Sequence, residues 1–454
     1  MTQKIDKIIV GLDIGSTKIC IVVARKDDYG KIEILGMGKA TSDGVTRGVV
    51  TNIDKTVVAI RKAKKEAEAQ SGINIRIVNV GIAGQHIRSF SQHGSITRPD
   101  GTKEISAEDV NRLTDDMYKV MNEPGTDIIH VMAQDYTIDG EINIKEPIGM
   151  LGVKLEADFH IITAATGSLG NIKKCLDKVD LVIDNIILEP IASGMSVLSD
   201  EERKYGVVLV DIGGGTTDIA IFHENIIRHT AVIPFGGAVI TSDIQQGCMV
   251  MDTQAELLKV RYGKAIAEEA DPNEIVTIPS LNNRAPKEIS VINLSRIIEA
   301  RIGEIIEEVH KEILRSKYSQ KLLGGIVVTG GGSMLAGLNN LFALMTGMDI
   351  RTGIPTEHLN KNNINAVKHP SYATPVGLVM AGFFAIDYRN EQSQSEKDSQ
   401  RHSYNKASKK PLEEEVKTPE KPEEKPMSFF QKVIDRTKKL LMDDFKEDED
   451  KKSY

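Results

Sequence analysis

The chain of 454 residues is about three times the size of a typical domain, so we expect about two to four domains. Hydrophobic residues make up 40% of it and charged residues 27%, which is near the norm for globular proteins. Its net charge is −8, and residues 389–454 hold 16 basic and 16 acidic residues, so the negative excess lies before them. A nucleic-acid-binding surface normally leaves a basic footprint, so no nucleic-acid partner is expected.

The three cysteines, Cys20, Cys175 and Cys248, are widely spaced and odd in number. They predict buried packing in a reducing compartment, with neither a disulfide framework nor metal-ligand spacing. The longest apolar stretch, residues 376–386, falls short of the ~20 residues that a membrane span needs, so no spanning helix is expected.

The first 83 residues predict a strand, a glycine turn, two more strands, a helix and a fourth strand. Their expected ranges are Lys7–Asp13, Ile14–Lys18, Ile19–Arg25, Ile32–Lys39, Ile53–Ser71 and Ile75–Ala83. The helix has apolar residues at helical spacing and stops before Gly72, a residue typical of helix ends.

From about Gly84 to Asp158 the pattern of expected strands and helices changes, and we expect a small inserted α+β unit of about 75 residues. It contains strand-like His86–Gly94 and Ile128–Ile138 and a helical stretch, Ser106–Asn122, with Ser106 as its N-cap. A further strand, Phe159–Thr166, and a helix, Gly167–Val179, are expected to follow it.

A second half then repeats the opening pattern. Tyr205–Asp211 predicts a strand, Ile212–Asp218 a glycine turn and Ile219–His223 a strand. The segments VGLDIGSTKICIVV and VLVDIGGGTTDIAIF each read strand, Asp, Ile-Gly turn, strand, roughly 200 residues apart. Internal duplication of one hairpin module is the simplest account.

The rest of the folded part predicts long helices and one more strand. The expected ranges are helices Ser242–Ala267 and Ser295–Ser316, strand Gly325–Val328, a helix from Gly330–Ser333 through Thr346, and a buried helix Tyr372–Ile386. Residues 389–426 are rich in charge, Ser and Pro and poor in apolar residues, so they are expected to be a disordered linker.

The two glycine turns predict a phosphate site. A Gly/Ser/Thr hairpin can present several backbone N–H groups to one point, as anion-binding nests do. Gly15-Ser16-Thr17-Lys18 and Gly213-Gly214-Gly215-Thr216-Thr217 both have this composition, and Lys18 offers a cation. Asp13 and Asp211 stand at matched positions before the turns and could hold Mg²⁺ through its waters. One such turn alone could be a plain tight turn, whereas the matched pair favours a nucleoside triphosphate clamp.

A third glycine segment, Gly330-Gly331-Gly332-Ser333, follows a predicted strand and precedes a predicted helix. Glycine there lets a flat ligand approach the backbone, and a helix N-terminus favours an anion. An adenosine contact and a plain strand-to-helix turn both remain open. The chain contains neither a Walker P-loop nor a G-x-G-x-x-G dinucleotide turn.

Three of these segments resemble a known set of motifs. LDIGSTK, VDIGGGTTD and VVTGGGSMLAGL are similar to the phosphate-1, phosphate-2 and adenosine motifs of the actin-like ATPase superfamily. Five further stretches resemble the FtsA family of bacterial cell-division proteins: SDGVTRGVVTNIDKTVVAIRKAKKEAEAQSG, VGIAGQHIRSFSQHGSI, EPIASGMSVL, IPFGGAVITSDIQ and YATPVGL. The resemblance covers about residues 7 to 387.

The resemblance implies an α/β, actin-like ATPase fold with two duplicated α/β domains around a nucleotide cleft. An inserted α+β subdomain called 1C, a disordered linker and a C-terminal amphipathic helix would complete it. The implied ranges are 1–84 and 161–195 for subdomain 1A, 85–160 for 1C, 196–388 for 2A and 2B with 2B at about 240–322, 389–426 for the linker and 427–446 for the helix.

It also implies roles for individual residues, with ATP and Mg²⁺ as cofactors. Phosphate would be held by Gly15, Ser16, Thr17, Lys18, Gly213, Gly214, Gly215, Thr216 and Thr217, Mg²⁺ by Asp13 and Asp211, and adenosine by Gly330, Gly331, Gly332 and Ser333. Glu256 and Lys259 match positions near the ribose and base. Glu189 matches the residue that positions the attacking water, and a simple helix-start carboxylate is its alternative. At most a weak ATPase is implied, with a regulatory or structural role for the nucleotide.

Residues 427–445 (MSFFQKVIDRTKKLLMDDF) predict an amphipathic helix, with Ser428 and Gln431 as a capping box. At ~100° per residue its apolar side chains fall on one face. They are Phe430, Val433, Ile434, Leu440, Leu441 and Phe445. A helix of this design can lie in a membrane interface, where Lys and Arg favour anionic lipid. Docking on another protein or on the core is the alternative, to which the acidic end of the chain gives only slight support.

The resemblance implies an ATP-binding cytoskeletal adaptor that polymerises and tethers the FtsZ ring to the cytoplasmic membrane during cell division and septum assembly. Its partners would be FtsZ, further copies of itself, anionic lipid and other divisome proteins, and its place the inner face of that membrane at the division site, as a peripheral protein. A sugar kinase using the same cleft is an alternative, but we find no aspartate motif for a substrate base. A shape- or elongation-type actin homologue is a second alternative, against which the insert at residues 84–158 speaks.

Overall fold

The computed structural model describes residues 7–27, 29–279, 285–360 and 364–387, and within them two five-stranded sheets share one arrangement. The first has the order β3-β2-β1-β6-β11 and the second the order β14-β13-β12-β17-β18. In each sheet the first three strands along the chain pair antiparallel, and the last two add in parallel beside the first strand. The predicted duplication is therefore confirmed.

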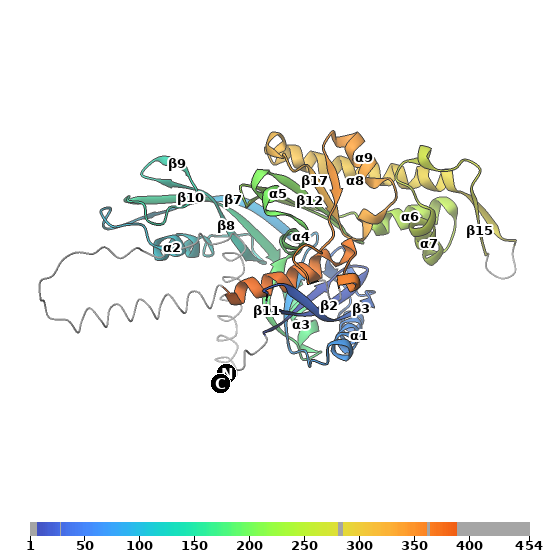
Figure 1. Ribbon diagram of the computed structural model, residues 1–454, viewed down its shortest axis with the longest axis horizontal. Helices are drawn as coiled ribbons and strands as arrows, with labels where there is room; N and C mark the ends of the chain where they lie inside the picture. Colours follow the sequence, from blue (N-terminus) through green and yellow to red (C-terminus); the bar gives the residue numbers. More distant parts are fainter. Residues whose placement is uncertain (1–6, 28, 280–284, 361–363, 388–454) are drawn as a thin grey trace, which may run out of the picture.

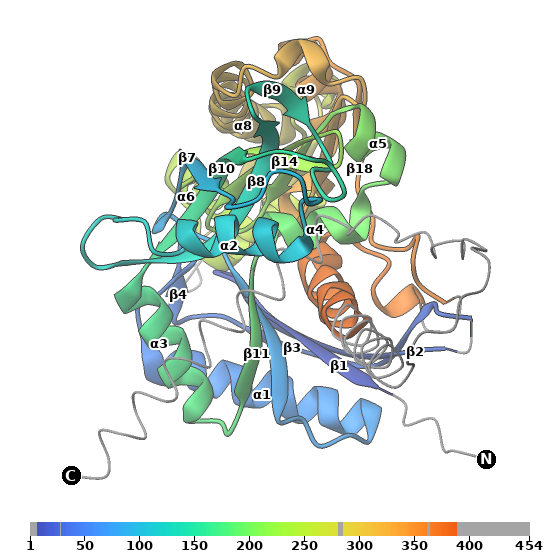
Figure 2. The same cartoon turned by 90° about the vertical axis from the view of Figure 1, so that its left-hand side faces the viewer.

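The first sheet lies between two layers of helix. Its strands are β1 (Ile8–Ile14), β2 (Lys18–Lys26), β3 (Ile32–Thr41), β6 (Ile77–Ile82) and β11 (Val182–Leu188). α1 (Ile53–Ser71) covers one face and a helix over residues 373–387 covers the other (Figure 2). Because both faces are covered, β1 and β2 are almost wholly buried apolar runs rather than alternating ones.

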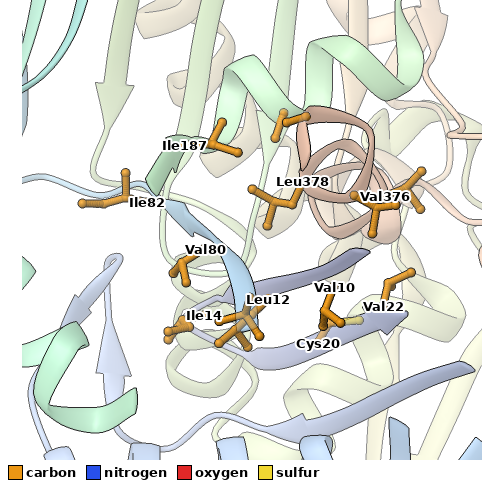
Figure 3. Packing of buried hydrophobic residues seen from close by; sticks show 14 of the residues in the cluster. Val10, Leu12, Ile14, Cys20, Val22, Val80, Ile82, Ile187, Val376 and Leu378 are labelled. Atoms are coloured by element: carbon orange, nitrogen blue, oxygen red, sulfur yellow. The ribbon is translucent and has the colours of Figure 1, made fainter. Parts of the chain in front are cut away.

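The helix over residues 373–387 packs tightly on this sheet. A methyl group at Gly11 would lie 2.7 Å from the carbonyl oxygen of Pro375, so glycine is needed for the approach. Val376 and Leu378 lie over the face of the sheet that carries Gly11 and its partner on β2, Val22 (Figure 3). The buried helix expected over residues 372–386 is confirmed within one residue at each end.

The chain segment that connects β6 to β11 forms a separate sheet. Its strands are β7 (Ile87–Thr97), β8 (Thr126–Ile138), β9 (Glu141–Ile144) and β10 (Lys154–Ala165), in the order β7-β10-β8-β9. With α2 (Ala107–Met117) they enclose a hydrophobic core of their own, and the unit projects from the rest of the molecule (Figure 1). Ser106 and Asp109 form the capping box at the start of α2, as expected.

The inserted unit differs from expectation at its end. The strand predicted over Phe159–Thr166 is the second half of β10, which pairs with β7 and β8 along its whole length. The boundary expected at residue 160 therefore falls inside a strand. After β10 the chain returns to the first sheet through α3 (Thr166–Asp177). The helix α2 also ends at Met117, earlier than the predicted Asn122.

The second half carries its own extra helices between β14 and β17. Its sheet strands are β12 (Val207–Ile212), β13 (Thr217–His223), β14 (Ile226–Ile233), β17 (Ile326–Thr329) and β18 (Ile350–Thr352). The added elements are α6 (Gly237–Cys248), α7 (Asp252–Tyr262), the hairpin β15 (Ile275–Ile278) and β16 (Lys287–Ser290), and α8 (Val291–Arg315). They extend away from the inserted unit (Figure 1).

Two helix predictions in the second half were wrong. The continuous helix expected over Ser242–Ala267 is two helices, because Met249 adopts a left-handed conformation with φ 46° that ends α6. The helix expected from Gly330 through Thr346 is a short 3₁₀ turn, Gly331–Met334, followed by α9 (Leu338–Thr346). Gly337, with φ 78°, breaks the two apart.

Several elements had no counterpart in the sequence-based interpretation. The two that matter for the site are β11 and α4 (Glu189–Val197), which runs on from it without a loop. Others are β4 (Val45–Thr46), β5 (Val49–Val50) and α5 (Asp200–Tyr205), together with β9, β14, β15, β16 and β18. No helix within the described ranges combines the length and the apolar composition needed to cross a bilayer. The predicted linker and amphipathic helix lie outside the described residues.

Candidate functional site

The two glycine hairpins have the same internal geometry. The Gly15 N–H donates to the Lys18 carbonyl oxygen at 3.0 Å, and the Gly213 N–H donates to the Thr216 carbonyl oxygen at 2.9 Å. Asp13 is the residue of β1 opposite Cys20 of β2, and Asp211 is the residue of β12 opposite Asp218 of β13. Each aspartate therefore precedes its turn at the same register position.

The hairpins touch one another through reciprocal positions. A methyl group at Gly214 would lie 2.1 Å from Thr17 Cγ2, and one at Gly215 would lie 2.5 Å from Ser16 Oγ. The side chains of the first turn thus occupy the space that glycine leaves open in the second. Residues about 200 positions apart in sequence meet in this way, as predicted from the matched turns.

Several backbone amides at this contact point have no acceptor. Among the residues that the structure describes, the N–H groups of Ser16, Thr17, Gly214 and Gly215 donate no hydrogen bond. Unpaired N–H groups from adjacent residues form the concave positive surface that binds phosphate oxygens. The nest composition predicted for both turns therefore coincides with free donors.

Four carboxyl groups gather behind the hairpins. Burial raises the pKa of Asp13 to about 6, against the opposing charge of Lys18 and with a further increase from Asp211. Burial also raises the pKa of Asp218 to about 7, with the charge of Asp211 adding to it. Burial and then the charges of Asp13, Asp218 and Asp211 hold the pKa of Glu189 well above its usual value. Closely spaced carboxylates that are shielded from water are stabilised either by protonation or by a bound cation.

Asp211 is held by two hydroxyl donors from distant parts of the chain. Ser193 of α4 donates to Asp211 Oδ2 at 2.8 Å, and Thr374 donates to the same oxygen at 3.3 Å. The two hydroxyl oxygens are themselves 3.0 Å apart. Burial still raises the pKa of Asp211, and these two bonds and Lys18 oppose the increase. α4 and the helix over residues 373–387 are thereby fixed to the second hairpin's aspartate.

Lys18 is engaged with protein groups. Its Nζ lies 3.7 Å from Asp13 Oδ2, donates to the Ser371 carbonyl oxygen, and lies 4.8 Å from the centroid of the Tyr372 ring. The expectation of a lysine available to phosphate needs this correction: the cation is placed between the first aspartate and the segment before the last helix. A phosphate would have to share it or draw it away.

The carboxyl groups fit a magnesium ion held through water. No three His, Cys, Asp or Glu side chains in the described ranges are close enough together to ligate an ion directly. Mg²⁺ keeps several waters and takes only one or two carboxylates, so Asp13 and Asp211 on opposite hairpins suit it. The second, unpaired oxygen of Asp218 (Oδ1) is buried and without a hydrogen-bond partner among described groups, which adds an acceptor there.

The third glycine segment lies directly against the second hairpin strand. Gly330 has φ 82°, and a methyl group there would lie 2.3 Å from Asp211 Oδ1. Gly332 packs on Ile212, while Gly331 faces open space. Ser333 closes the turn by donating to the Gly330 carbonyl oxygen at 2.8 Å. The four residues are thus next to the second hairpin, although they do not begin an α-helix.

Glu256 and Lys259 are connected to the second hairpin through the first residue of α6. Lys259 Nζ donates to Glu256 Oε2 at 2.7 Å and to the Gly237 carbonyl oxygen at 3.0 Å. Gly237 in turn donates its N–H to the Gly213 carbonyl oxygen at 2.9 Å. The pair therefore contacts the first residue of α6, which is itself hydrogen-bonded to the second hairpin.

Glu189 lies at the start of a helix and near the aspartates, and its role in positioning a water stays a prediction. It is the first residue of α4, which makes it a helix-start carboxylate, and its charge couples to the three aspartates of the site. Its Oε1 would lie 3.3 Å from a methyl group at Gly81 of β6, so glycine leaves room for it. The carboxyl group is thereby placed between the two hairpins' aspartates and the first sheet.

Sequence reasoning missed three residues of the site. Asp218 is buried and accepts a hydrogen bond from Thr216 Oγ1 at 2.8 Å, and the repeat of Asp in DIGGGTTD was the available signal. Ser193 and Thr374 bind Asp211 from elements remote in sequence, and nothing in their local pattern marks them. The predicted membrane-contact residues from Phe430 to Phe445 lie outside the described residues.

Comparisons with known proteins agree with this geometry. Residues 208–377 match the family model described as cell division protein FtsA, and residues 84–163 match the model of the SHS2 domain inserted in FtsA. The chain is 42% identical to the cell division protein FtsA of Pseudomonas aeruginosa over 83% of its length and 89% of the relative's. It is 34% identical to the protein of the same name from Escherichia coli K12, over 83% and 90%.

The chain belongs to the FtsA family. The predicted membership is confirmed, and the protein is a cell-division protein of actin-like architecture. Among solved structures, a PilM–PilN type IV pilus biogenesis complex has a TM-score of 0.58 at 14% identity, covering 82% of this chain and 98% of that one. MreB5 of Spiroplasma citri bound to AMPPNP has a TM-score of 0.52 at 12% identity, covering 86% and 99%. At such identities they show the fold alone, which is the actin-like ATPase fold predicted from the sequence.

Proposed function

We propose that this FtsA-family chain binds ATP with Mg²⁺ between its two glycine hairpins. The carrying observation is the convergence of Asp13 and Asp211, from the two halves, beside turns whose amides have no acceptor. The N–H groups of Ser16, Thr17, Gly214 and Gly215 would receive phosphate oxygens. Gly331, which faces open space, leaves room for the adenosine beside Asp211.

The raised pKa values of the buried carboxyl groups are the reason why the proposal includes a metal ion. Without a cation, the shared burial favours protons on Asp13, Asp218 and Glu189. When bound, Mg²⁺ supplies the positive charge that stabilises the carboxylates and the phosphate together. Asp13 and Asp211 would hold it through its waters, and Lys18 would contribute a second positive charge from the first hairpin. MreB5, a fold neighbour, was solved with AMPPNP, an ATP analogue.

Glu189 would orient a water toward the terminal phosphate. Its carboxyl group is anchored by α4, and the same helix carries Ser193, which positions Asp211. We expect at most weak hydrolysis, so the nucleotide would act mainly by holding the two halves together. Equilibrium binding of a fluorescent ATP, with Mg²⁺ and with EDTA, tests the first step. Micromolar or tighter binding that needs Mg²⁺ supports the proposal, and equal weak signal in both conditions contradicts it.

At the level of the cell, we propose an adaptor that polymerises and tethers the FtsZ ring to the inner face of the cytoplasmic membrane. Family membership supports this role, and the actin-like fold supports head-to-tail stacking, because a heterologous contact that does not close generates filaments. Negative-stain images on a lipid monolayer with ATP should show filaments. A chain that stays monomeric on lipid at all concentrations contradicts the proposal.

Membrane attachment would come from the apolar stripe of residues 427–445, on the strength of the sequence pattern alone. Truncation after Lys425 should abolish flotation with anionic liposomes while leaving ATP binding intact. Phe430→Glu should do nearly the same, whereas Lys439→Ala should matter little and mainly at low salt. If the truncated chain floats as well as the full chain, docking of this segment on protein replaces the membrane proposal. Adding FtsZ to the same assay tests the tether: FtsZ should float only with the full chain.

A further inference from the structure

A buried histidine of the inserted unit reaches the first sheet. His130 lies on β8, is fully buried, and accepts a hydrogen bond at Nε2 from the N–H of Leu188 at 3.1 Å. Burial lowers the pKa of His130 to about 3, so the ring stays neutral and Nε2 remains an acceptor. The contact joins residues 58 positions apart, from two different sheets.

The N–H group that donates to His130 lies at the junction of a strand and a helix. Leu188 is the last residue of β11 and the N-cap residue of α4, whose first residue is Glu189. β11 is the outermost strand of its sheet, so the Leu188 N–H has no neighbouring strand to pair with on that side. No side chain caps α4 at its start. A buried N–H left without an acceptor costs ~1–3 kcal/mol, which His130 avoids.

The histidine itself carries a cost that simple packing would not require. Because Nε2 accepts, the proton must be on Nδ1, and Nδ1 is buried with no hydrogen-bond partner among the described groups. A leucine or phenylalanine could fill similar space without burying an unpaired donor. The use of an imidazole therefore points to the bond with Leu188 rather than to volume.

The same strand also contacts the second half of the molecule. Four residues after His130, Gln134 Nε2 donates to the Ile227 carbonyl oxygen of β14 at 2.9 Å. Asp135 then pairs with the buried Arg228 at 2.8 Å. β8 is thus attached at one point to the start of α4 and at the next to the second half.

We propose that His130 is a positioning residue that fixes the start of α4 and thereby the carboxyl group of Glu189. The bond holds Leu188, one residue before Glu189 and five before Ser193, which donates to Asp211. A shift of the inserted unit would then move the carboxyl group that faces the nucleotide. The proposal rests on the proposed function, in which Glu189 orients the attacking water.

The test compares three variants of the full chain. His130→Gln keeps an acceptor near the position of Nε2, and His130→Leu keeps bulk without an acceptor. His160→Leu is the matched control, because His160 is a buried histidine of the neighbouring strand β10 whose Nε2 contacts Thr230 of β14 at 3.0 Å instead of α4. Hydrogen–deuterium exchange of peptides covering residues 182–198, ATP affinity and single-turnover hydrolysis are measured for each.

For His130→Leu we expect at least tenfold faster exchange at the start of α4 and at least tenfold slower hydrolysis, with ATP affinity within about threefold of wild type. His130→Gln should restore most of both losses, and His160→Leu should change neither. Wild-type exchange and hydrolysis in His130→Leu, or a Gln variant as impaired as the Leu variant, would overturn the proposal. Should His130→Leu not fold, exchange in the wild type decides: a Leu188 amide that exchanges as fast as an open edge amide overturns it. Absence of ATP hydrolysis in the wild type would refute the proposed chemistry, while the exchange data would still decide the bond.

Discussion

The two halves of the molecule share a strand order but differ in what their hairpins carry. The first turn has side chains at Ser16 and Thr17, and the second has glycine at both matched positions, Gly214 and Gly215. In space each pair faces the other, so the side chains of one turn fill the room left by the other. One turn thus supplies the side-chain bulk and the other the space, which lets the two backbone turns approach closely.

The charges of the halves differ in the same complementary way. The strand position opposite the aspartate is Cys20 in the first half and Asp218 in the second. Burial raises the pKa of the Cys20 thiol to about 12, so that side chain stays neutral, whereas Asp218 adds a fourth carboxyl group. Only the first turn has a lysine, Lys18. The comparison teaches that the site is asymmetric: the cation comes from one half and the extra acid from the other.

The largest effect on ATP·Mg²⁺ affinity should come from a side chain at Gly214, because Thr17 of the other hairpin already fills the space it would need. Gly214→Val would place carbon within 2.1 Å of Thr17 Cγ2, so the hairpins must separate. We expect ATP·Mg²⁺ affinity to fall at least 100-fold in equilibrium binding, about 2.7 kcal/mol or more. Thr17→Gly in the same chain should restore part of the loss, because it returns the space to the other hairpin. A Gly214→Val chain that binds as wild type would contradict the complementary packing.

The extra acid should appear in the pH dependence of stability. The folded-state pKa of Asp218 is about 7, above its unfolded value, so its contribution makes the metal-free chain less stable as the pH rises from about 4 to 7. Asp218→Asn removes that loss, and the melting temperature of the variant should exceed that of wild type above pH 7 and approach it below pH 4. At ~1.4 kcal/mol per pKa unit the difference amounts to a few kcal/mol at most. If the difference in melting temperature between the variant and wild type does not change across this pH range, burial does not raise the pKa of Asp218.

The cation of the first half should matter less. Lys18→Met removes the charge beside Asp13 and the bond to Ser371 while keeping most of the side-chain volume. We expect ATP·Mg²⁺ affinity to fall about tenfold by calorimetry, in line with ~1.5–3 kcal/mol for a charge-assisted hydrogen bond that is partly replaced. Lys39→Met, an exposed lysine on the neighbouring strand β3, is the control and should leave affinity unchanged. Equal affinities in all three proteins would remove Lys18 from the site.

The smallest effect should come from glycines outside the hairpins. Gly167 and Gly170 of α3 have open space where a methyl group would go and have no unusual backbone conformation. Gly167→Ala or Gly170→Ala should therefore raise the free energy of unfolding by about 0.4–1 kcal/mol in urea titrations, with unchanged ATP affinity. A destabilised variant would mean that α3 is more tightly surrounded than the structure shows.

The hairpins, their aspartates and the duplicated frame could be predicted because each is local and each is repeated. Strand and turn signals lie within about 15 residues, and the two copies support one another. The FtsA-family membership and the actin-like fold followed from motifs of the same kind. Elements without a local signal were missed: β11 runs straight into α4, and Met249 ends a helix without a glycine or proline at that residue.

The partners of the site could not be predicted, because they depend on distant segments meeting. Ser193 and Thr374 reach Asp211 across 18 and 163 positions, and His130 reaches Leu188 across 58. Likewise, the sequence indicated Lys18 as a phosphate cation but not its contact with Ser371, which lies 353 positions away. Such contacts are made by the fold, and short patterns do not encode them.

The most direct test of the account is the Mg²⁺-dependent ATP affinity of four full-length proteins, measured by isothermal titration calorimetry: wild type, Asp13→Ala, Asp211→Ala and the double variant. If one ion is held between the halves, each single substitution should weaken ATP·Mg²⁺ binding at least tenfold, and the double variant should lose less than the sum of the two losses in binding free energy. With EDTA, the four affinities should be similar. Wild-type affinity for ATP·Mg²⁺ in both single variants would contradict a site shared by the two hairpins.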